Sequence, residues 1–173
     1  MPNRLPYKID PFRSAAHKMQ LQGNFMLGDM QRLVPSLHST EGEVTVDADF
    51  AMDEQDICVL KGQLKTSLTL QCQRCMEPFK YDIIDEFLSG IVQTEDEAEK
   101  LPEQYDPVIA IEGELALLDM IEDEIIIALP IVPMHDANKC KVKLPLEAGT
   151  TESNNPFNVI SILRSKDDLK SKE

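Results

Sequence analysis

Apolar and polar residues alternate through the first half of the chain, and this pattern predicts a sheet. From Glu43 an apolar residue stands at every second position, as expected of a strand with one buried face. The polar run 53–56 has the composition of a hairpin turn. Long extended runs follow at 57–70, where Gly62 suggests a bulge or bend, and at 79–92. Strands joined by such short connections predict an antiparallel sheet.

Apolar residues spaced by three and four positions predict one main helix over residues 114–129, which a proline ends. Near the N-terminus, Asp10 and Pro11 fit a helix start, with Gly23 as the stop. Asp29 can cap a second short helix. Together these patterns predict an α+β fold. Its sheet is twisted and mainly antiparallel, either open or a partly closed barrel, and the main helix covers it.

The length of 173 residues fits a single domain. Residues 1–140 are expected to form this α+β domain. Residues 141–173 are expected to be a flexible linker and C-terminal tail, because 141–155 contain few hydrophobic residues. A short apolar cluster stands within that tail at 156–163.

Two features predict a cytoplasmic protein with no membrane partner. The longest apolar run, at 125–131, is far shorter than the ~20 residues of a membrane span. The N-terminus carries charge but lacks the apolar core of a secretory signal. In the reducing cytoplasm the four cysteines are expected to be free or metal-bound rather than paired in disulfides.

The charge is unevenly distributed. The 31 acidic and 17 basic residues give a net charge of −14, which excludes nucleic-acid binding spread over the whole surface. Residues 82–124 alone carry −14, whereas 1–40 and 61–81 carry +3 each. The acidic segment is either a solvated face, to which the helix residues Asp119, Glu122 and Asp123 would belong, or a docking surface for a basic partner, such as a ribosomal protein or another nucleic-acid-binding protein. The candidate RNA-binding residues are Arg13, Lys18, Lys61, Lys65, Arg74 and Lys80.

Cys72 and Cys75 form a Cys-x-x-Cys pair between two predicted strands, a spacing that lets two thiolates bind one tetrahedral metal ion. His135 and Cys140 follow the main helix and would complete a Cys3His set. A zinc ion there would join the hairpin to the segment after the helix. The alternatives are an empty site or a thiol redox pair. Redox chemistry is disfavoured because a strand, rather than a helix, follows the pair.

Signatures of catalysis are absent from the sequence. It has no glycine-rich phosphate loop and no Gly-x-Ser-x-Gly motif, and its seven glycines are scattered. We therefore expect that the protein is not an enzyme. The alternative is a zinc-dependent or thiol redox protein that uses Cys72 and Cys75.

Several motifs resemble one bacterial family. They are Leu70–Phe79 with its Cys-x-x-Cys, Leu101–Pro107, Glu122–Asp136, Asn155–Phe157 and the early Asp10-Pro11. Together they resemble the YceD family of large ribosomal RNA subunit accumulation proteins. The resemblance implies a non-enzymatic role in the synthesis, processing or stability of 23S ribosomal RNA, and hence in large-subunit assembly. It implies 23S ribosomal RNA or its precursor as a direct or indirect partner. Family members commonly carry the Cys-x-x-Cys and a later cysteine-containing pair, which is consistent with a metal site.

Overall fold

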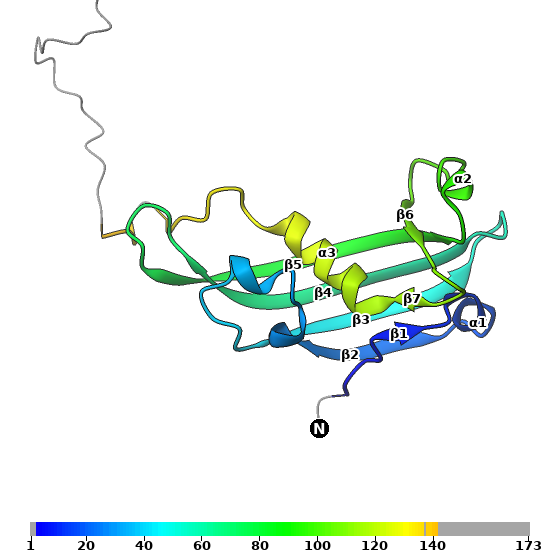
Figure 1. Cartoon of the computed structure of the whole chain (residues 1–173), viewed down its shortest axis with the longest axis horizontal. Helices are drawn as coiled ribbons and strands as arrows, with labels where there is room; N and C mark the ends of the chain where they lie inside the picture. The colour runs from blue at the N-terminus through cyan, green and yellow to red at the C-terminus, as the bar shows by residue number, and fades with distance from the viewer. Residues whose placement is uncertain (1–2, 137, 142–173) are drawn as a thin grey trace, which may run out of the picture. The chain divides into compact units, whose positions relative to one another are not determined.

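A five-stranded sheet is the largest element of the fold (Figure 1). The computed structural model describes residues 3–136 and 138–141. The strands lie in the order β2 (Gln20–Met26), β3 (Glu43–Met52), β4 (Cys58–Gln71), β5 (Pro78–Val92) and β6 (Asp106–Ile109). The first four are antiparallel, and β6 runs parallel to β5. The predicted α+β fold with a mainly antiparallel sheet is confirmed. The partly closed barrel is wrong, because β2 and β6 are edges and do not pair.

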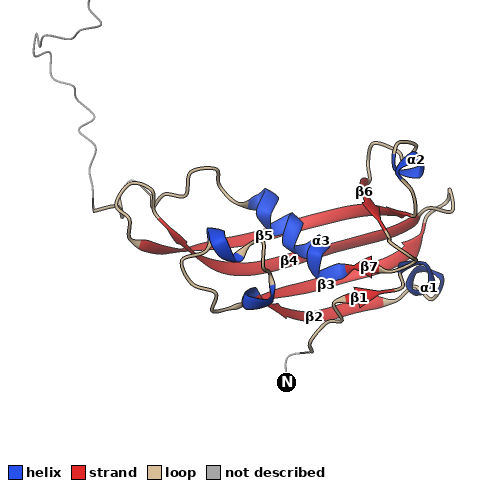
Figure 2. Ribbon diagram, in the orientation of Figure 1, coloured by secondary structure: helices blue, strands red, loops and turns tan. Residues whose placement is uncertain are grey.

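One main helix lies across one face of this sheet, as Figure 2 shows. It is α3 (Leu117–Ala128), which begins three residues later than predicted because β7 (Leu115–Ala116) precedes it and pairs with β1 (Lys8–Ile9). The smaller helices are α1 (Pro11–Ala16) and α2 (Glu95–Ala98). The helix expected after Asp29 is replaced by two 3-10 helices, Leu27–Asp29 and Val34–Ser36.

The core lies between the sheet and α3. In β3, alternate residues from Val44 to Phe50 are buried, as the alternating pattern predicts. The helix contributes Leu117, Ile121 and Ile125, which are all fully buried. The residues between the buried ones on each strand face the opposite side of the sheet, where they are polar and exposed along β3. The buried face of the strands and the apolar stripe of α3 therefore pack against one another in one apolar layer.

Gly62 is not a bulge. The pairing register runs without interruption through this position, with Ala48 on one side and Phe87 on the other. A Cβ atom at Gly62 would lie 2.6 Å from Cζ of Phe87 and 2.7 Å from Cβ of Ala48. The position needs glycine because the Phe87 ring occupies the space of a side chain.

The first helix begins as predicted but ends early. Asp10 is its N-cap, and Oδ1 of Asp10 accepts a hydrogen bond of 2.9 Å from the backbone N–H of Arg13. The chain turns after the helix at Lys18, whose φ is +51°. Gly23 then lies inside β2 rather than at a helix end. A Cβ there would stand 2.1 Å from the carbonyl oxygen of Asn3. Residues 20–22, which the spacing assigned to the end of a helix, thus belong to the edge strand β2.

Glu122 does not face water, contrary to the prediction. Only 3% of it is exposed. Its Oε1 accepts hydrogen bonds from the backbone N–H groups of Arg32, at 2.7 Å, and Leu33, at 2.9 Å. Its Oε2 accepts one from Nε of Arg32 at 3.2 Å. Asp119 and Asp123 on the same helix are exposed, as predicted. The buried carboxylate therefore accepts the hydrogen bonds of backbone N–H groups in a loop that is distant in sequence.

Contacts group residues 1–141 into one compact unit. Apart from Lys141, the predicted tail, with its apolar cluster at 156–163, lies outside the described residues. Within the described part of the chain, no helix is long and apolar enough to cross a membrane.

Candidate metal centre

The four predicted metal ligands come from two segments of the chain. Cys72 directly follows β4, and Cys75 lies in the turn that leads into β5. His135 and Cys140 come from the segment after α3. The ligand atoms of all four residues lie within 4.8 Å of one another. Cys72 and Cys140 are buried, while Cys75 and His135 are half-buried. The structure thus brings together residues that are up to 68 positions apart.

The turn between β4 and β5 carries both thiols of the Cys-x-x-Cys pair. The backbone N–H of Cys72 donates to the carbonyl of Glu77 at 2.9 Å, and that of Met76 donates to the carbonyl of Cys72 at 2.8 Å. Met76 has a φ of +62°, in the left-handed region. These bonds close the turn tightly at the end of two long paired strands. Cys72 and Cys75 are therefore held by a rigid hairpin.

The segment after α3 is attached to this turn by its backbone. The N–H of Gln73 donates to the carbonyl of Pro133 at 2.9 Å. Further along, the N–H of Cys140 donates to the carbonyl of Asp136 at 3.2 Å, which closes a second turn. His135 lies between these two bonds in the sequence. The first bond attaches the segment to the hairpin before His135, and the second folds the segment into a turn after it.

Short contacts join the ligand side chains. Sγ of Cys75 lies 3.3 Å from Nδ1 of His135. Arg74 donates from Nε to Sγ of Cys140 at 3.0 Å, and from a terminal nitrogen to the carbonyl of His135 at 3.4 Å. Arg74 is one of the predicted RNA-binding residues, and the structure places its guanidinium beside the four candidate metal ligands.

The two thiols of the pair differ in acidity. Burial opposes ionisation of Cys72 most strongly, yet backbone N–H groups of His135, Cys75 and Arg74, with the His135 side chain, lower the pKa of Cys72 to about 5. At Cys75 a backbone hydrogen bond at Glu77 acts to lower the pKa, but burial and the neighbouring thiols of Cys140 and Cys72 raise it overall. Adjacent thiolates repel one another, and a bound cation removes that repulsion.

The donor set suits a structural zinc ion. Zinc in structural sites is tetrahedral and takes four nitrogen or sulfur ligands, and Cys3His is one of its common sets. The four residues would occupy all four positions and leave none open for a substrate. When bound, the ion would supply a cross-link between the hairpin and the segment after α3.

A comparison with protein families matches residues 60–167 to the family described as Large ribosomal RNA subunit accumulation protein YceD. The matched range is more than half of the chain and contains all four candidate ligands. The chain belongs to the YceD family. A protein from Haemophilus influenzae named Large ribosomal RNA subunit accumulation protein YceD is 35% identical over 172 residues, covering 94% of this chain and 98% of that protein. No solved structure matches the chain. The resemblance of the sequence motifs to YceD is thus confirmed.

The other basic residues predicted for RNA binding in this YceD-family chain lie in two further places. Arg13 is in α1 and Lys18 lies two residues beyond its end, and both are exposed. The remaining three are exposed on the sheet face opposite α3; they are Lys61 and Lys65 on β4 and Lys80 on β5. Acids lie among them, since Asp49 is the direct partner of Lys61 in the register. The six residues are therefore not one basic patch.

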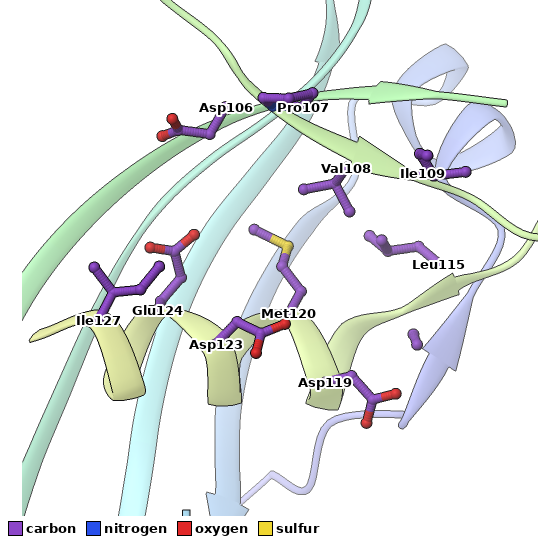
Figure 3. Close-up of a pocket in the computed structure, with 11 residues that line it drawn as sticks. Asp106, Pro107, Val108, Ile109, Leu115, Asp119, Met120, Asp123, Glu124 and Ile127 are labelled. Carbon is purple, nitrogen blue, oxygen red and sulfur yellow. The ribbon is translucent and has the colours of Figure 1, made fainter. Parts of the chain in front are cut away.

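A groove that sequence reasoning did not locate lies between β6 and α3 (Figure 3). Its volume is about 630 Å³. Val108 of β6 and Met120 of α3 point toward one another within it, as Figure 3 shows. Four acids of the 82–124 segment line it, namely Asp106, Asp119, Asp123 and Glu124. The excess of acids in this segment was the only sequence signal for the groove. The strand that forms one wall, β6, has four residues and no clear alternation, so it was not predicted.

Proposed function

We propose that this protein supports the accumulation of 23S ribosomal RNA, and hence large-subunit assembly, by binding rather than by catalysis. We place this activity in the cytoplasm, where ribosomal subunits are assembled. The observation that carries the proposal is membership of the YceD family, together with a named accumulation protein that matches 94% of the chain. The closed ligand set described above supports a binding role, because four protein ligands leave a metal ion no open position for a substrate.

The metal in this proposal is zinc, held by Cys72, Cys75, His135 and Cys140. Support comes from the convergence of four zinc-type donors within 4.8 Å and from the backbone bonds that fix both segments. In this role the ion holds the β4–β5 hairpin and the segment after α3 in one arrangement. A thiol redox function is the rival. It uses only Cys72 and Cys75 and leaves the adjacent His135 and Cys140 without a role.

The partner in this proposal is 23S ribosomal RNA or its precursor, contacted directly or through a ribosomal protein. For direct contact we propose the exposed lysines on the sheet face opposite α3, with Lys61 and Lys65 on β4 and Lys80 on β5. Phosphate contacts of this kind are sensitive to salt, because bound counterions are released. The interspersed acids would limit such contact to a few phosphates.

The experiment is to delete the gene in its host and measure the ratio of 23S to 16S ribosomal RNA. The proposal predicts a lower ratio, which a plasmid copy of the natural gene restores. An unchanged ratio during growth at several temperatures would contradict the proposed function. The ratio is the appropriate measurement because a general loss of ribosome synthesis lowers both RNAs together.

Direct RNA contact is tested by electrophoretic titration with fragments of 23S ribosomal RNA. We expect the variant Lys61→Ala, Lys65→Ala, Lys80→Ala to bind more weakly than the natural protein and to show a smaller salt dependence. The comparison variant is Arg13→Ala with Lys18→Ala, which removes two of the other predicted RNA-binding charges from another place and shows whether the sheet face contributes more. Equal binding by the triple variant and the natural protein would count against the sheet face as the RNA-binding surface.

A further inference from the structure

The groove between β6 and α3 combines an apolar floor with an acidic rim. Its floor includes Val108 and the side chain of Met120, which face one another in Figure 3. At the end of the groove stands Ile127, which is 79% exposed although it is a large aliphatic residue on α3. Ile109 on β6 is 39% exposed. Single exposed apolar residues are ordinary, but here two of them border one hollow that has a buried apolar base.

The acids around the groove are short of cations. Asp123 forms an ion pair with Arg32. Asp106, Asp119 and Glu124 have no such partner among the described residues. Burial raises the pKa of the Glu124 carboxyl group, and the negative charges of Asp106, Asp85 and Asp123 raise it further. A positive charge that entered the groove would relieve this repulsion.

We propose that this groove binds a basic, partly apolar segment of a ribosomal protein, with an aliphatic side chain over Val108 and Met120 and lysine or arginine side chains at Asp106, Asp119 and Glu124. This inference rests on the proposed role in large-subunit assembly and names the partner of that role. Charge complementarity selects the occupant. An RNA strand would bring phosphates to three uncompensated carboxylates, whereas a cationic peptide neutralises them. The groove also offers apolar contacts that a phosphate backbone cannot use.

The C-terminal part of this chain and a second copy of the chain are weaker candidates on the same grounds. Residues 142–173 contain five basic and five acidic residues and carry no net charge. A second copy carries the same net charge of −14. Neither brings a net positive charge to the acidic rim. Both are outcomes that the experiment below can reveal.

The experiment places a photoreactive benzoylphenylalanine at position 127 in the full chain, expressed in cells, and identifies the cross-linked products by mass spectrometry. The expected product joins position 127 to a lysine- and arginine-rich segment of a large-subunit ribosomal protein. The control carries the same photoreactive residue in place of Ile84, which is 68% exposed on the opposite face of the sheet. The control should not yield this product.

Two matched pairs of substitutions test the role of charge in the full chain with the cross-linker at position 127. Asp106→Asn with Glu124→Gln should reduce the yield of the product by about tenfold, because two of the three rim charges without an ion-pair partner are lost. Glu99→Gln with Glu103→Gln removes the same charge from exposed positions outside the groove and should leave the yield unchanged. None of the four substituted acids belongs to a described ion pair, so the groove variant and the control variant are both expected to fold.

Several outcomes would overturn the proposal. These are a cross-link to RNA, to residues 142–173 of the same chain or to a second copy, the absence of any product at position 127, and an equal yield from the two charge variants. None of these outcomes bears on the ratio of 23S to 16S RNA after gene deletion. A failure of the groove proposal is therefore distinguishable from a failure of the proposed function.

Discussion

The carboxylate of Glu122 in α3 accepts a hydrogen bond of 2.9 Å from the backbone N–H of Leu33, 89 residues earlier in the chain. Leu33 is fully buried, and Glu122 is almost so. The same oxygen accepts a second bond from the N–H of Arg32. A charged side chain in the core thus replaces the backbone partners that a strand or helix would supply. It fixes the loop before Val34–Ser36 onto the main helix.

Replacing Glu122 by Ala should therefore destabilise the protein strongly. The substitution leaves two backbone N–H groups without their acceptor and the Arg32 guanidinium without its buried partner. We expect a loss of about 3 kcal/mol in the free energy of unfolding, measured by urea denaturation. The control is Asp123→Ala, which removes the exposed carboxylate of the same arginine and should cost less than about 1 kcal/mol. Equal effects of the two substitutions would contradict the assigned role of Glu122.

Gly62→Ala should be destabilising because of packing in the middle of the sheet. The new Cβ would meet the Phe87 ring, the Ala48 side chain and the carbonyl oxygen of Asp47, all within 2.7 Å. We expect a loss of about 2 kcal/mol, since backbone and ring must both shift. Gly28→Ala is the control, because its Cβ would have no neighbour within 4 Å. A Gly62→Ala protein as stable as the Gly28→Ala protein would show that the ring does not occupy that space.

Glu124→Gln should stabilise the protein at neutral pH. Burial and the charges of Asp106, Asp85 and Asp123 raise the pKa of Glu124 in the folded state. The folded state then binds a proton more readily than the unfolded chain, so its stability falls as pH rises through the window between the unfolded and folded pKa. Glutamine removes this loss.

The measurement is the melting temperature as a function of pH. The advantage of Glu124→Gln should be present above the folded pKa and vanish below the ordinary pKa range of glutamate, where the natural side chain is neutral in both states. Glu99→Gln serves as the control at an exposed position. An advantage of Glu124→Gln that is the same at every pH would have another cause.

Removal of the metal should loosen the joint between the β4–β5 hairpin and the segment after α3. We expect the purified protein to contain zinc in a ratio of about one per chain, and a strong chelator to lower its melting temperature by more than about 5 °C. Titration with Co²⁺ provides a spectroscopic check, because thiolate ligands give a charge-transfer band. Cys140→Ser should reduce that band by about a third, since one of three thiolates is lost. A metal-free protein that a chelator does not affect would favour the thiol redox alternative.

The long strands and the main helix could be predicted because local pattern and tertiary environment agree there. Residues of β3 alternate between a buried and an exposed face, and the apolar stripe of α3 meets that buried face. The four candidate ligands could also be named, because Cys-x-x-Cys and His-x4-Cys spacings limit where thiolates and imidazole can converge.

Features that depend on distant partners were missed or misassigned. Residues after Lys18 have no strong strand pattern, and they join the sheet because β3 offers a free edge. Glu122 looks like any surface acid until the loop at Arg32 is placed beside it. The groove arises from the parallel pairing of β6 with β5, which no local rule specifies. The predicted Cys3His set brings Arg74 near Cys140, but the hydrogen bond from Nε of Arg74 to Sγ of Cys140 does not follow from residue spacing.

We propose that this YceD-family protein supports 23S ribosomal RNA through a fold that depends on the four-residue metal centre. Cys58 provides the matched control, because it is buried in the core outside the centre and burial, with Asp10, raises the pKa of its thiol to about 11. The most direct test is the ratio of 23S to 16S RNA in gene-deleted cells that express either Cys140→Ser or Cys58→Ala. We predict that Cys58→Ala restores the ratio and Cys140→Ser does not. Full restoration by Cys140→Ser would contradict the claim.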